Sequence, residues 1–346
     1  MALGRRTLDL QLFSFEMSTF LKAGLSISEA LALLMNRLRS PLERQFATAL
    51  HESILEGHSL SDSLERLGGP LADVLVALVR SAEQSGQVPM AFERFAAYRE
   101  RLVQAQRKIV TALIYPMLLV SVGLVVITFL LLYIVPRFAS VYGELERDLP
   151  WASSLMVRWG TWVSTHPRTI RAILVVLIGF IAALIVSPQL RRDVVEAGLG
   201  VSFVRDIRRD FDLGKFYYTV SLLLESGLPA LQAVALSRDV LGPRYASAHH
   251  LLVQFIESGQ SLSDALQQSG LSTDIAERLV RSGEGSGSMS TMLRHCAMIH
   301  EEDTWRFLER FTRGFEPIST VVLGLVIGGL VVLMYLPIFE LSQAIE

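Results

Sequence analysis

The sequence has few of the residues that hold secreted domains together or bind nucleic acid. Cys296 is the only cysteine, so no disulfide can form within one chain and nothing indicates an oxidising compartment for the folded parts. Basic and acidic residues nearly balance, at 32 and 34, which argues against the strongly basic surface of a nucleic-acid-binding protein. We therefore expect no nucleic-acid partner.

The chain also lacks a convincing nucleotide site. The glycine-rich segment 283–287 is similar to a phosphate-binding loop, but no predicted strand precedes it. A Walker lysine is missing as well, because Gly214-Lys215 is followed by Phe216 rather than by serine or threonine. The sequence predicts no cofactor, and a protein that does not hydrolyse ATP by itself.

Histidine, cysteine and carboxylate clusters with catalytic or metal-binding spacing are also absent from the sequence. His295 and His300 are five residues apart, so they do not stack on one helix face as a zinc pair does. Cys296 lies beside His295 without a third partner in the pattern, which favours a packed small residue. We predict a protein that is not an enzyme and has no metal site. A membrane-bound enzyme using these three residues is the alternative hypothesis.

Long uncharged apolar runs are what the sequence does contain. Hydrophobic residues make up 51% of the chain and its mean hydropathy is +0.41, more than a soluble globular protein usually shows. The runs 109–135 and 317–339 are long enough to cross a bilayer core of about 30 Å. A third segment, 170–188, contains the shorter run Ala172–Val186 and spans if Arg171 reaches the interface. No span has an interior charge, which argues against a transporter or channel component, the alternative from another class.

The arginines flanking these three segments predict their direction. Basic residues are concentrated before the first span, after the middle span and before the last, while the C-terminal tail has none. The positive-inside rule then gives a cytoplasmic N-terminus and a periplasmic C-terminus. The predicted soluble segments are cytoplasmic 1–108, periplasmic 136–169, cytoplasmic 189–316 and the periplasmic tail 340–346.

The two cytoplasmic segments are copies of one domain. Leu78–Gly86 recurs as Leu279–Gly287, and Gly24-Leu25 recurs as Gly227-Leu228. The separation stays similar, at 201 residues from Leu78 to Leu279 and 203 from Gly24 to Gly227. Two homologous domains are expected to fold in one compartment, and each is followed by a span in the same direction. A third crossing between them is then required, which supports the middle span.

Each copy is predicted to be a bundle of about six helices. Apolar residues recur at three- and four-residue spacing, and Ser26 followed by Glu29 is a capping-box pattern. Ser59 and Ser261 each precede an aspartate by three residues, which also marks a helix start. Pro229 is expected at the first position of a helix in the second copy. The predicted fold class is all-α, a polytopic membrane protein with two homologous cytoplasmic six-helix bundles and three transmembrane helices.

One pair of turns and one glycine pair are the candidate contact sites. Each turn has a glutamate, a serine and a helix-ending glycine. We interpret these turns either as loops that contact a partner or as helix–helix turns whose polar groups bond nearby amides. The Gly-x-x-x-Gly pattern in the last span is a candidate helix-packing surface. The residues are Glu83, Ser85 and Gly86, then Glu284, Ser286 and Gly287, and in the span Gly324 and Gly328.

Taken together and in order, the duplicated motifs resemble the type II secretion protein F family, which includes the inner-membrane core protein of type IV pili. The resemblance covers essentially the whole chain, although family members often carry an extension before the first domain, which here begins close to Met1. The motifs are Gly24-Leu25, Gly57-His58-Ser59-Leu60, Glu83-x-Ser85-Gly86 and Tyr115-Pro116, with counterparts Gly227-Leu228, Gly259-Gln260-Ser261-Leu262, Glu284-x-Ser286-Gly287 and Glu316-Pro317.

The resemblance implies a bacterial inner-membrane platform protein that couples a cytoplasmic ATPase to pseudopilus assembly and protein export. The type IV pilus machine is the alternative within the same class. The expected partners are the assembly ATPase, other inner-membrane secretion components, pilin-like subunits, membrane lipids and further copies of the chain.

Overall fold

The computed structural model describes residues 9–38, 40–68, 72–142, 151–168, 170, 179 and 202–343 of the chain. All regular elements among them are helices, so the predicted all-α class is confirmed. Of the predicted middle span 170–188, only Ile170 and Gly179 lie within the described residues. The C-terminal half of the predicted tail, 344–346, also lies outside them.

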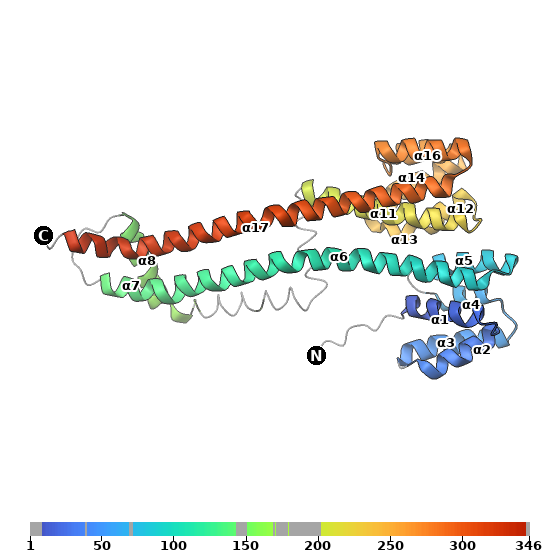
Figure 1. The fold of residues 1–346 in the computed structure, drawn as a ribbon, viewed down its shortest axis with the longest axis horizontal. Helices are drawn as coiled ribbons and strands as arrows, with labels where there is room; N and C mark the ends of the chain where they lie inside the picture. Colours follow the sequence, from blue (N-terminus) through green and yellow to red (C-terminus); the bar gives the residue numbers. More distant parts are fainter. Residues whose placement is uncertain are drawn as a thin grey trace. The chain divides into compact units, whose positions relative to one another are not determined.

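The described residues divide into two compact units, and the first unit holds both sequence repeats (Figure 1). It contains Met1–Arg107 and Asp206–Trp305. The first repeat contributes α1 (Leu10–Lys22), α2 (Ile27–Arg37), α3 (Pro41–Leu55), α4 (Leu60–Leu67), α5 (Ala72–Ser85) and the start of α6 (Val88–Phe129). The second contributes α11 (Ser202–Glu225), α12 (Ala230–Leu236), α13 (Arg238–Leu241), η2 (Pro243–Tyr245), α14 (Ala246–Glu257), α15 (Leu262–Gln268), α16 (Asp274–Ser286) and the start of α17 (Met289–Gln343).

Side-chain caps fix the starts of several helices as the sequence predicts. The Ser26 hydroxyl accepts from the Glu29 amide at 3.3 Å, and the Glu29 carboxylate accepts from the Ser26 amide at 2.9 Å. The bonds that the Glu29 carboxylate accepts from the Ser26 amide and hydroxyl lower the pKa of Glu29. Ser59 and Ser261 each accept from the amide three residues later at 3.1 Å. Pro229 is the N-cap of α12, so it lies at the start of that helix as predicted.

One hydrophobic core runs through both repeats. Equivalent positions on the first helix of each repeat are buried to the same extent, since Phe13 and Phe216 are 3% and 1% exposed. The largest side chains in this core with almost no exposure come from both copies: Tyr98, Tyr217, Phe92, Phe95, Phe216 and Met17. The two repeats therefore share one core.

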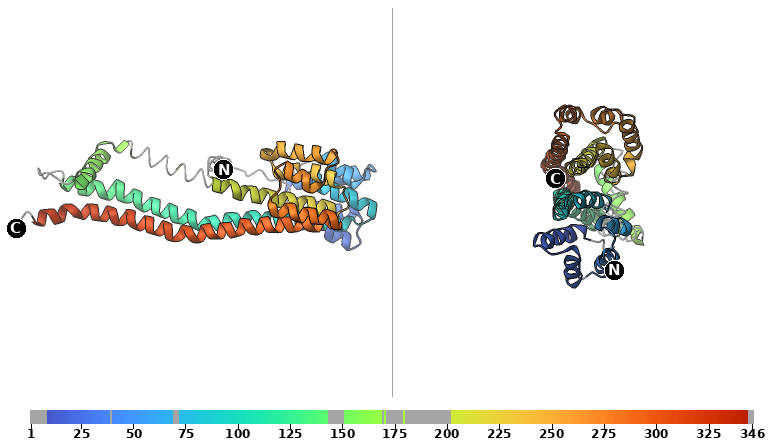
Figure 2. Two further views of the ribbon diagram at one scale, coloured as in Figure 1. Left: turned by 90° about the horizontal axis from the view of Figure 1, so that it is seen from above. Right: turned by 90° about the vertical axis from the view of Figure 1, so that its right-hand side faces the viewer.

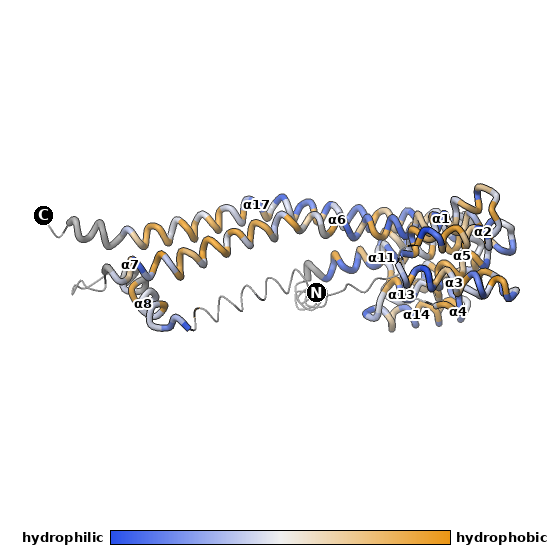
Figure 3. Tube along the Cα trace, turned by 90° about the horizontal axis from the view of Figure 1, so that it is seen from below, coloured by the Kyte–Doolittle hydropathy of each residue, from blue (hydrophilic) through white to orange (hydrophobic). Residues whose placement is uncertain are grey.

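The second unit contains the apolar continuations of the two longest helices. It covers Lys108–Arg205 and Arg306–Glu346, with η1 (Leu130–Ile134), α7 (Val135–Tyr142) and α8 (Trp151–Thr165). Val88–Ser140 and Met289–Tyr335 are long and apolar enough to cross a membrane, and Figure 3 shows these apolar stretches in orange. Only 11% and 6% of their most apolar windows are buried in the protein. Apolar helices of this length that stay largely unburied are more stable in a lipid bilayer than in water.

Within this unit α6 and α17 pack closely at a glycine that the sequence analysis did not select. A β-carbon at Gly123 would lie 2.5 Å from the Leu323 Cδ2 atom, so a larger residue there requires the Leu323 side chain to move. A β-carbon at Gly324 or Gly328 would meet no atom of the described chain within 4 Å. The packing role of the glycine pair therefore stays a prediction.

Candidate partner-contact loops and the interface between the repeats

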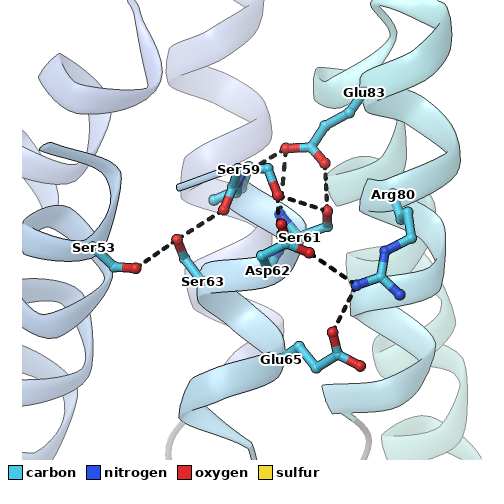
Figure 4. Close-up of polar contacts among 9 residues, drawn as sticks. Ser53, Ser59, Ser61, Asp62, Ser63, Glu65, Arg80 and Glu83 are labelled. Carbon is cyan, nitrogen blue, oxygen red and sulfur yellow. Dashed lines mark hydrogen bonds and ion pairs between the residues drawn. The ribbon is translucent and has the colours of Figure 1, made fainter. Parts of the chain in front are cut away.

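Glu83 connects the end of α5 to the start of α4 (Figure 4). Its Oε1 atom accepts from the backbone amides of Leu60 at 2.8 Å and Ser61 at 3.3 Å, and its Oε2 atom accepts from the Ser61 hydroxyl at 2.5 Å. A helix leaves its first amides without partners and has a positive N-terminal end. A carboxylate held there by three donors joins the two helices firmly.

The second repeat builds the same arrangement with different neighbours. Glu284 accepts from the Leu262 amide at 2.5 Å, the Ser263 amide at 3.2 Å and the Ser263 hydroxyl at 2.5 Å. Because all three bonds occur in both copies, we interpret them as a structural feature of the repeated domain. Both glutamate carboxylates are thus used inside the domain.

The remaining loop residues are exposed. Gly86 and Gly287 both have φ of +70°, which is the left-handed conformation that ends a helix and favours glycine. Ser85 and Ser286 are exposed and donate to backbone carbonyls one turn earlier in their own helices. The turn interpretation therefore accounts for the glutamates, while the exposed serines and glycines stay a predicted partner surface.

An arginine one turn before each glutamate is paired differently in the two repeats. Arg80 bonds Asp62 at 3.2 Å and Glu65 at 2.7 Å, as Figure 4 shows. Arg281 bonds Asp264 at 3.1 Å and Glu277 at 3.1 Å. These ion pairs are exposed, so each contributes at most about 1 kcal/mol to folding. These ion pairs lie beside the glutamate contact that both repeats share, but they differ between the repeats and so do not determine that contact.

The interface between the repeats centres on Tyr98 of α6. Its hydroxyl bonds the Thr219 hydroxyl of α11 at 3.0 Å, and its ring stacks on Tyr218 with centroids 5.8 Å apart. Tyr98 is 0% exposed, and burial raises its pKa. The end-on view in Figure 2 shows α6 beside the second repeat. Tyr98 and Thr219 are both 0% exposed, so the centre of this interface is as buried as a domain core.

Polar contacts surround Tyr98 along the same face of α6. Arg101 forms two bonds to the Glu301 carboxylate, at 3.1 and 2.7 Å, and its guanidinium lies 4.7 Å from the centre of the Tyr218 ring. Arg94 donates to the Ser226 hydroxyl at 3.4 Å. The spacing of Arg94, Tyr98 and Arg101 is that of one helix face. This interface was not predicted from the sequence, although the spacing of these three residues on one helix face was a usable signal.

The structure does not gather the residues of the enzyme hypothesis into a site. His300 is buried, its Nδ1 atom lies 3.1 Å from Asp210 Oδ1, and its ring stacks on Tyr217. Cys296 is 1% exposed, and burial raises its pKa to about 12, so its thiol is unreactive near neutral pH. His295 is exposed. No group of three metal-ligating side chains occurs among the described residues.

Comparisons with known proteins cover almost the whole chain. The sequence model of the family described as type II secretion system (T2SS), protein F matches residues 13–136 and 216–337. The chain is 29% identical to the type 4 fimbrial assembly protein PilC of Pseudomonas putida, over 96% of this chain and 84% of the relative. It is 28% identical to type II secretion system protein F of Pseudomonas aeruginosa, over 99% of this chain and 85% of that relative. It is 26% identical to the type IV pilus assembly protein PilC of the same organism, over 98% of this chain and 91% of that relative.

Proposed function

Because the chain belongs to the type II secretion system protein F family, we propose that it is the inner-membrane platform of a type II secretion system. In this role it couples a cytoplasmic assembly ATPase to pseudopilus assembly and protein export. The observation that carries the proposal is the single compact unit that contains both repeats, with one apolar helix continuing from each repeat. Such a unit can pass a movement to two membrane helices at once.

The shared unit also supports the proposed three spans. Tyr98 of the first repeat and Thr219 of the second are hydrogen-bonded in a buried interface, which supports placing both repeats on one side of the membrane. If α6 crosses the bilayer, the chain has to cross back before α11 begins. The apolar run Ala172–Val186 is long enough for this crossing when its flanks reach the interface.

We accordingly propose two homologous six-helix bundles in the cytoplasm and three transmembrane helices. The cytoplasmic parts are 1–108 and 189–316, and the spans are 109–135, 170–188 and 317–339. The segment 136–169 and the tail 340–346 are periplasmic. Arginine placement supports this orientation under the positive-inside rule.

The partner surface of the proposed platform consists of the exposed ends of the two glutamate turns. Ser85 and Gly86, and their counterparts Ser286 and Gly287, are exposed, while Glu83 and Glu284 hold the turns in place from inside. The chain carries no Walker motif of its own, so in this proposal the energy comes from the partner ATPase. Pilin-like subunits and other inner-membrane secretion components complete the assembly.

Association with the cognate assembly ATPase tests this proposal. We expect the full chain in nanodiscs to retain the ATPase on a column, and Ser85→Arg to weaken binding about tenfold or more because a long charged side chain blocks a packed contact. Gln254→Arg on an exposed position of α14 is the control and should bind normally. If the unmodified chain retained no ATPase, the proposal would be contradicted. If both variants bound the ATPase equally, the turn at Ser85 would not be part of the partner surface.

Type IV pilus assembly is the second candidate function. The observation in its favour is the 29% identity to a fimbrial assembly protein over 96% of this chain, beside 28% to a secretion protein. Deleting the gene separates the two candidates. A strain that loses export of a secreted enzyme and keeps its pili has the secretion platform, and the reverse outcome identifies the pilus platform.

A further inference from the structure

The helix α8 carries two rows of exposed side chains that differ in chemistry. Residues three and four apart lie on one face of a helix, and each row has this spacing. The rings of the aromatic row follow one another, with successive centroids 5.6 and 5.5 Å apart. The polar row begins two residues later, so at 3.6 residues per turn the rows lie about 160° apart around the helix. The aromatic row is Trp159, Trp162 and His166, and the polar row is Thr161, Ser164 and Arg168.

A third face of α8 packs on the outer ends of both apolar helices. A β-carbon at Gly160 would overlap the β-carbon of Ala139, so a larger residue here would push α8 and α7 apart. Figures 1 and 2 show α8 crossing α7. Val157 packs against the cluster that Val135 of α7 and Met334 of α17 form. The helix α8 is therefore held against the ends of both predicted spans.

One hydrogen bond gives the depth of the aromatic row. The Trp159 indole N–H donates to the Leu131 carbonyl at 3.1 Å. Leu131 belongs to η1 and lies inside the uncharged run 109–135. The close approach of Gly160 is to Ala139, which is about 12 Å further along the helix at 1.5 Å per residue. The aromatic row therefore lies on the side of α8 that faces the middle of the span, and the polar row lies on the side away from it.

The end of the first span carries the side chains that are typical of a membrane interface. Tyr133 is 47% exposed, and the Arg137 guanidinium lies 4.4 Å from the centre of its ring. Arg137 is also the first charged residue after the uncharged run. Tryptophan and tyrosine collect where hydrocarbon meets lipid headgroups, and arginines reach the headgroups from there. Leu131 and Arg137 are about 9 Å apart along the helix, close to the thickness of one headgroup layer.

We propose that α8 is an interfacial membrane helix, with Trp159 and Trp162 inserted among the phospholipids of the outer leaflet and the polar row in water. An amphipathic helix with aromatic side chains on one face binds a lipid surface in this way, because it buries its apolar face at the boundary of headgroups and acyl chains. Lipid is the occupant of the aromatic row because this row adjoins the part of the span where Phe129 and Tyr133 are 53% and 47% exposed. A water-filled loop would leave two tryptophans that are each 40% exposed without an apolar environment.

An interfacial α8 fixes the depth at which the two apolar helices stand in the bilayer. Gly160 holds α8 to α7, and Val157 contacts the cluster that includes α17. A shift of either span by one turn along the membrane normal would move the tryptophans out of the interface, into hydrocarbon or into water. The helix thus resists vertical displacement from the outer side of the membrane. This inference rests on the proposed spans 109–135 and 317–339, but not on the partner ATPase or on the choice between secretion and pilus assembly.

Quenching of tryptophan fluorescence by brominated phospholipids tests the inference. The full chain is placed in nanodiscs with Trp162 as its only tryptophan, and phenylalanine replaces Trp151, Trp159 and Trp305. The matched control is Ser164→Trp in a chain without other tryptophans, because position 164 is exposed on the polar row of the same helix. We expect lipids brominated near the headgroup to quench Trp162 at least about threefold more strongly than the control tryptophan. Acrylamide dissolved in the water should quench the two in the opposite order.

A tryptophan in the middle of the first span separates failure of the inference from failure of the topology. Val125 is 66% exposed, so Val125→Trp in the tryptophan-free chain should be quenched by lipids brominated deep in the acyl chain. If this tryptophan is quenched while lipid quenches Trp162 and Ser164→Trp equally, the span stands and the interfacial helix is overturned. If Trp162 is quenched by acrylamide alone, the aromatic row is left for a protein partner, which also overturns the inference. No lipid quenching of Val125→Trp would contradict both the proposed span and the inference.

Single cysteines give a second measurement that leaves the other tryptophans in place. We expect a membrane-impermeant maleimide to react with Ser164→Cys in spheroplasts about tenfold faster than with Trp162→Cys, because a thiolate forms and reacts in water and not among lipids. Cys296 is buried and contributes no background. Equal rates at the two positions would overturn the inference, and ATPase retention is measured separately from both tests.

Discussion

Replacing Tyr98 with alanine is expected to lower the free energy of unfolding of the unit that contains both repeats by about 3–5 kcal/mol, the range for removing a large aromatic ring from a packed interior. The ring is 0% exposed, stacks on Tyr218 and bonds Thr219. The cavity would lie between the two repeats, so they should separate before either loses its own helices. Thermal unfolding of the full chain in detergent, followed by circular dichroism and by protease cutting between the repeats, measures both effects.

Two further variants show whether this loss comes from the ring. Tyr98→Phe keeps the stacking and removes one hydrogen bond, so we expect a loss of about 1 kcal/mol. Leu55→Ala, at a side chain that is 67% exposed, should change stability by less than about 0.5 kcal/mol. If Tyr98→Ala were as stable as Tyr98→Phe, the repeats would not share the interface described here.

Removing the carboxylate of either turn is expected to cost about 2–4 kcal/mol, because hydrogen bonds to a charged group are strong and their donors are left partly buried without partners. Glu83 holds two amides and one hydroxyl at the start of α4, and Glu284 holds the same set at the start of α15. Glu83→Ala and Glu284→Ala should therefore have similar effects. Denaturant unfolding of each full-length variant gives the two values.

Glu65→Ala is the matched control for the glutamate variants. Glu65 is also an acid bonded across to α5, but its carboxylate meets only the Arg80 guanidinium and is 62% exposed. The expected loss is below about 1 kcal/mol, as for other surface ion pairs. Stable Glu83→Ala and Glu284→Ala variants that nonetheless fail to bind the ATPase would show that the glutamates act at the partner surface instead.

Local rules made much of the helical framework predictable from the sequence. The Ser26 capping box, the Ser59 and Ser261 caps and the helix-ending Gly86 and Gly287 depend on residues within a few positions of one another. Glu83 and Glu284 were predicted as candidate site residues because the same short motif contains them in both repeats. Their bonding partners lie 21 to 23 residues away, which spacing alone does not reveal.

The contacts between distant segments were not predictable from pattern alone. Tyr98 and Thr219 are 121 residues apart, and only packing decides that the first helix of the second repeat covers the last helix of the first. The glycine that allows close approach of α6 and α17 is Gly123, not the motif pair Gly324 and Gly328. A glycine motif indicates that another helix can pack closely against this helix. The position of the close contact depends on the side chains of the facing helix.

The two repeats have kept their inner contacts and diverged on their outer faces. The glutamate turns have the same bonds in both copies. Phe15 and Tyr218 occupy equivalent positions, yet one is exposed and the other lies in the interface. A duplicated domain can in this way provide both the fixed contact inside a chain and an open contact for a partner.

The side of the membrane on which each repeat lies is the most direct test of the account. Leu55 and Glu257 are exposed at corresponding places in the two repeats, and Thr161 is exposed on α8. Single cysteines at these positions can be labelled with a membrane-impermeant maleimide, while buried Cys296 gives no background. We expect Leu55→Cys and Glu257→Cys to react only after the membrane is opened and Thr161→Cys to react in intact spheroplasts. Labelling of Leu55→Cys and Glu257→Cys from opposite sides would contradict a single cytoplasmic unit built from both repeats.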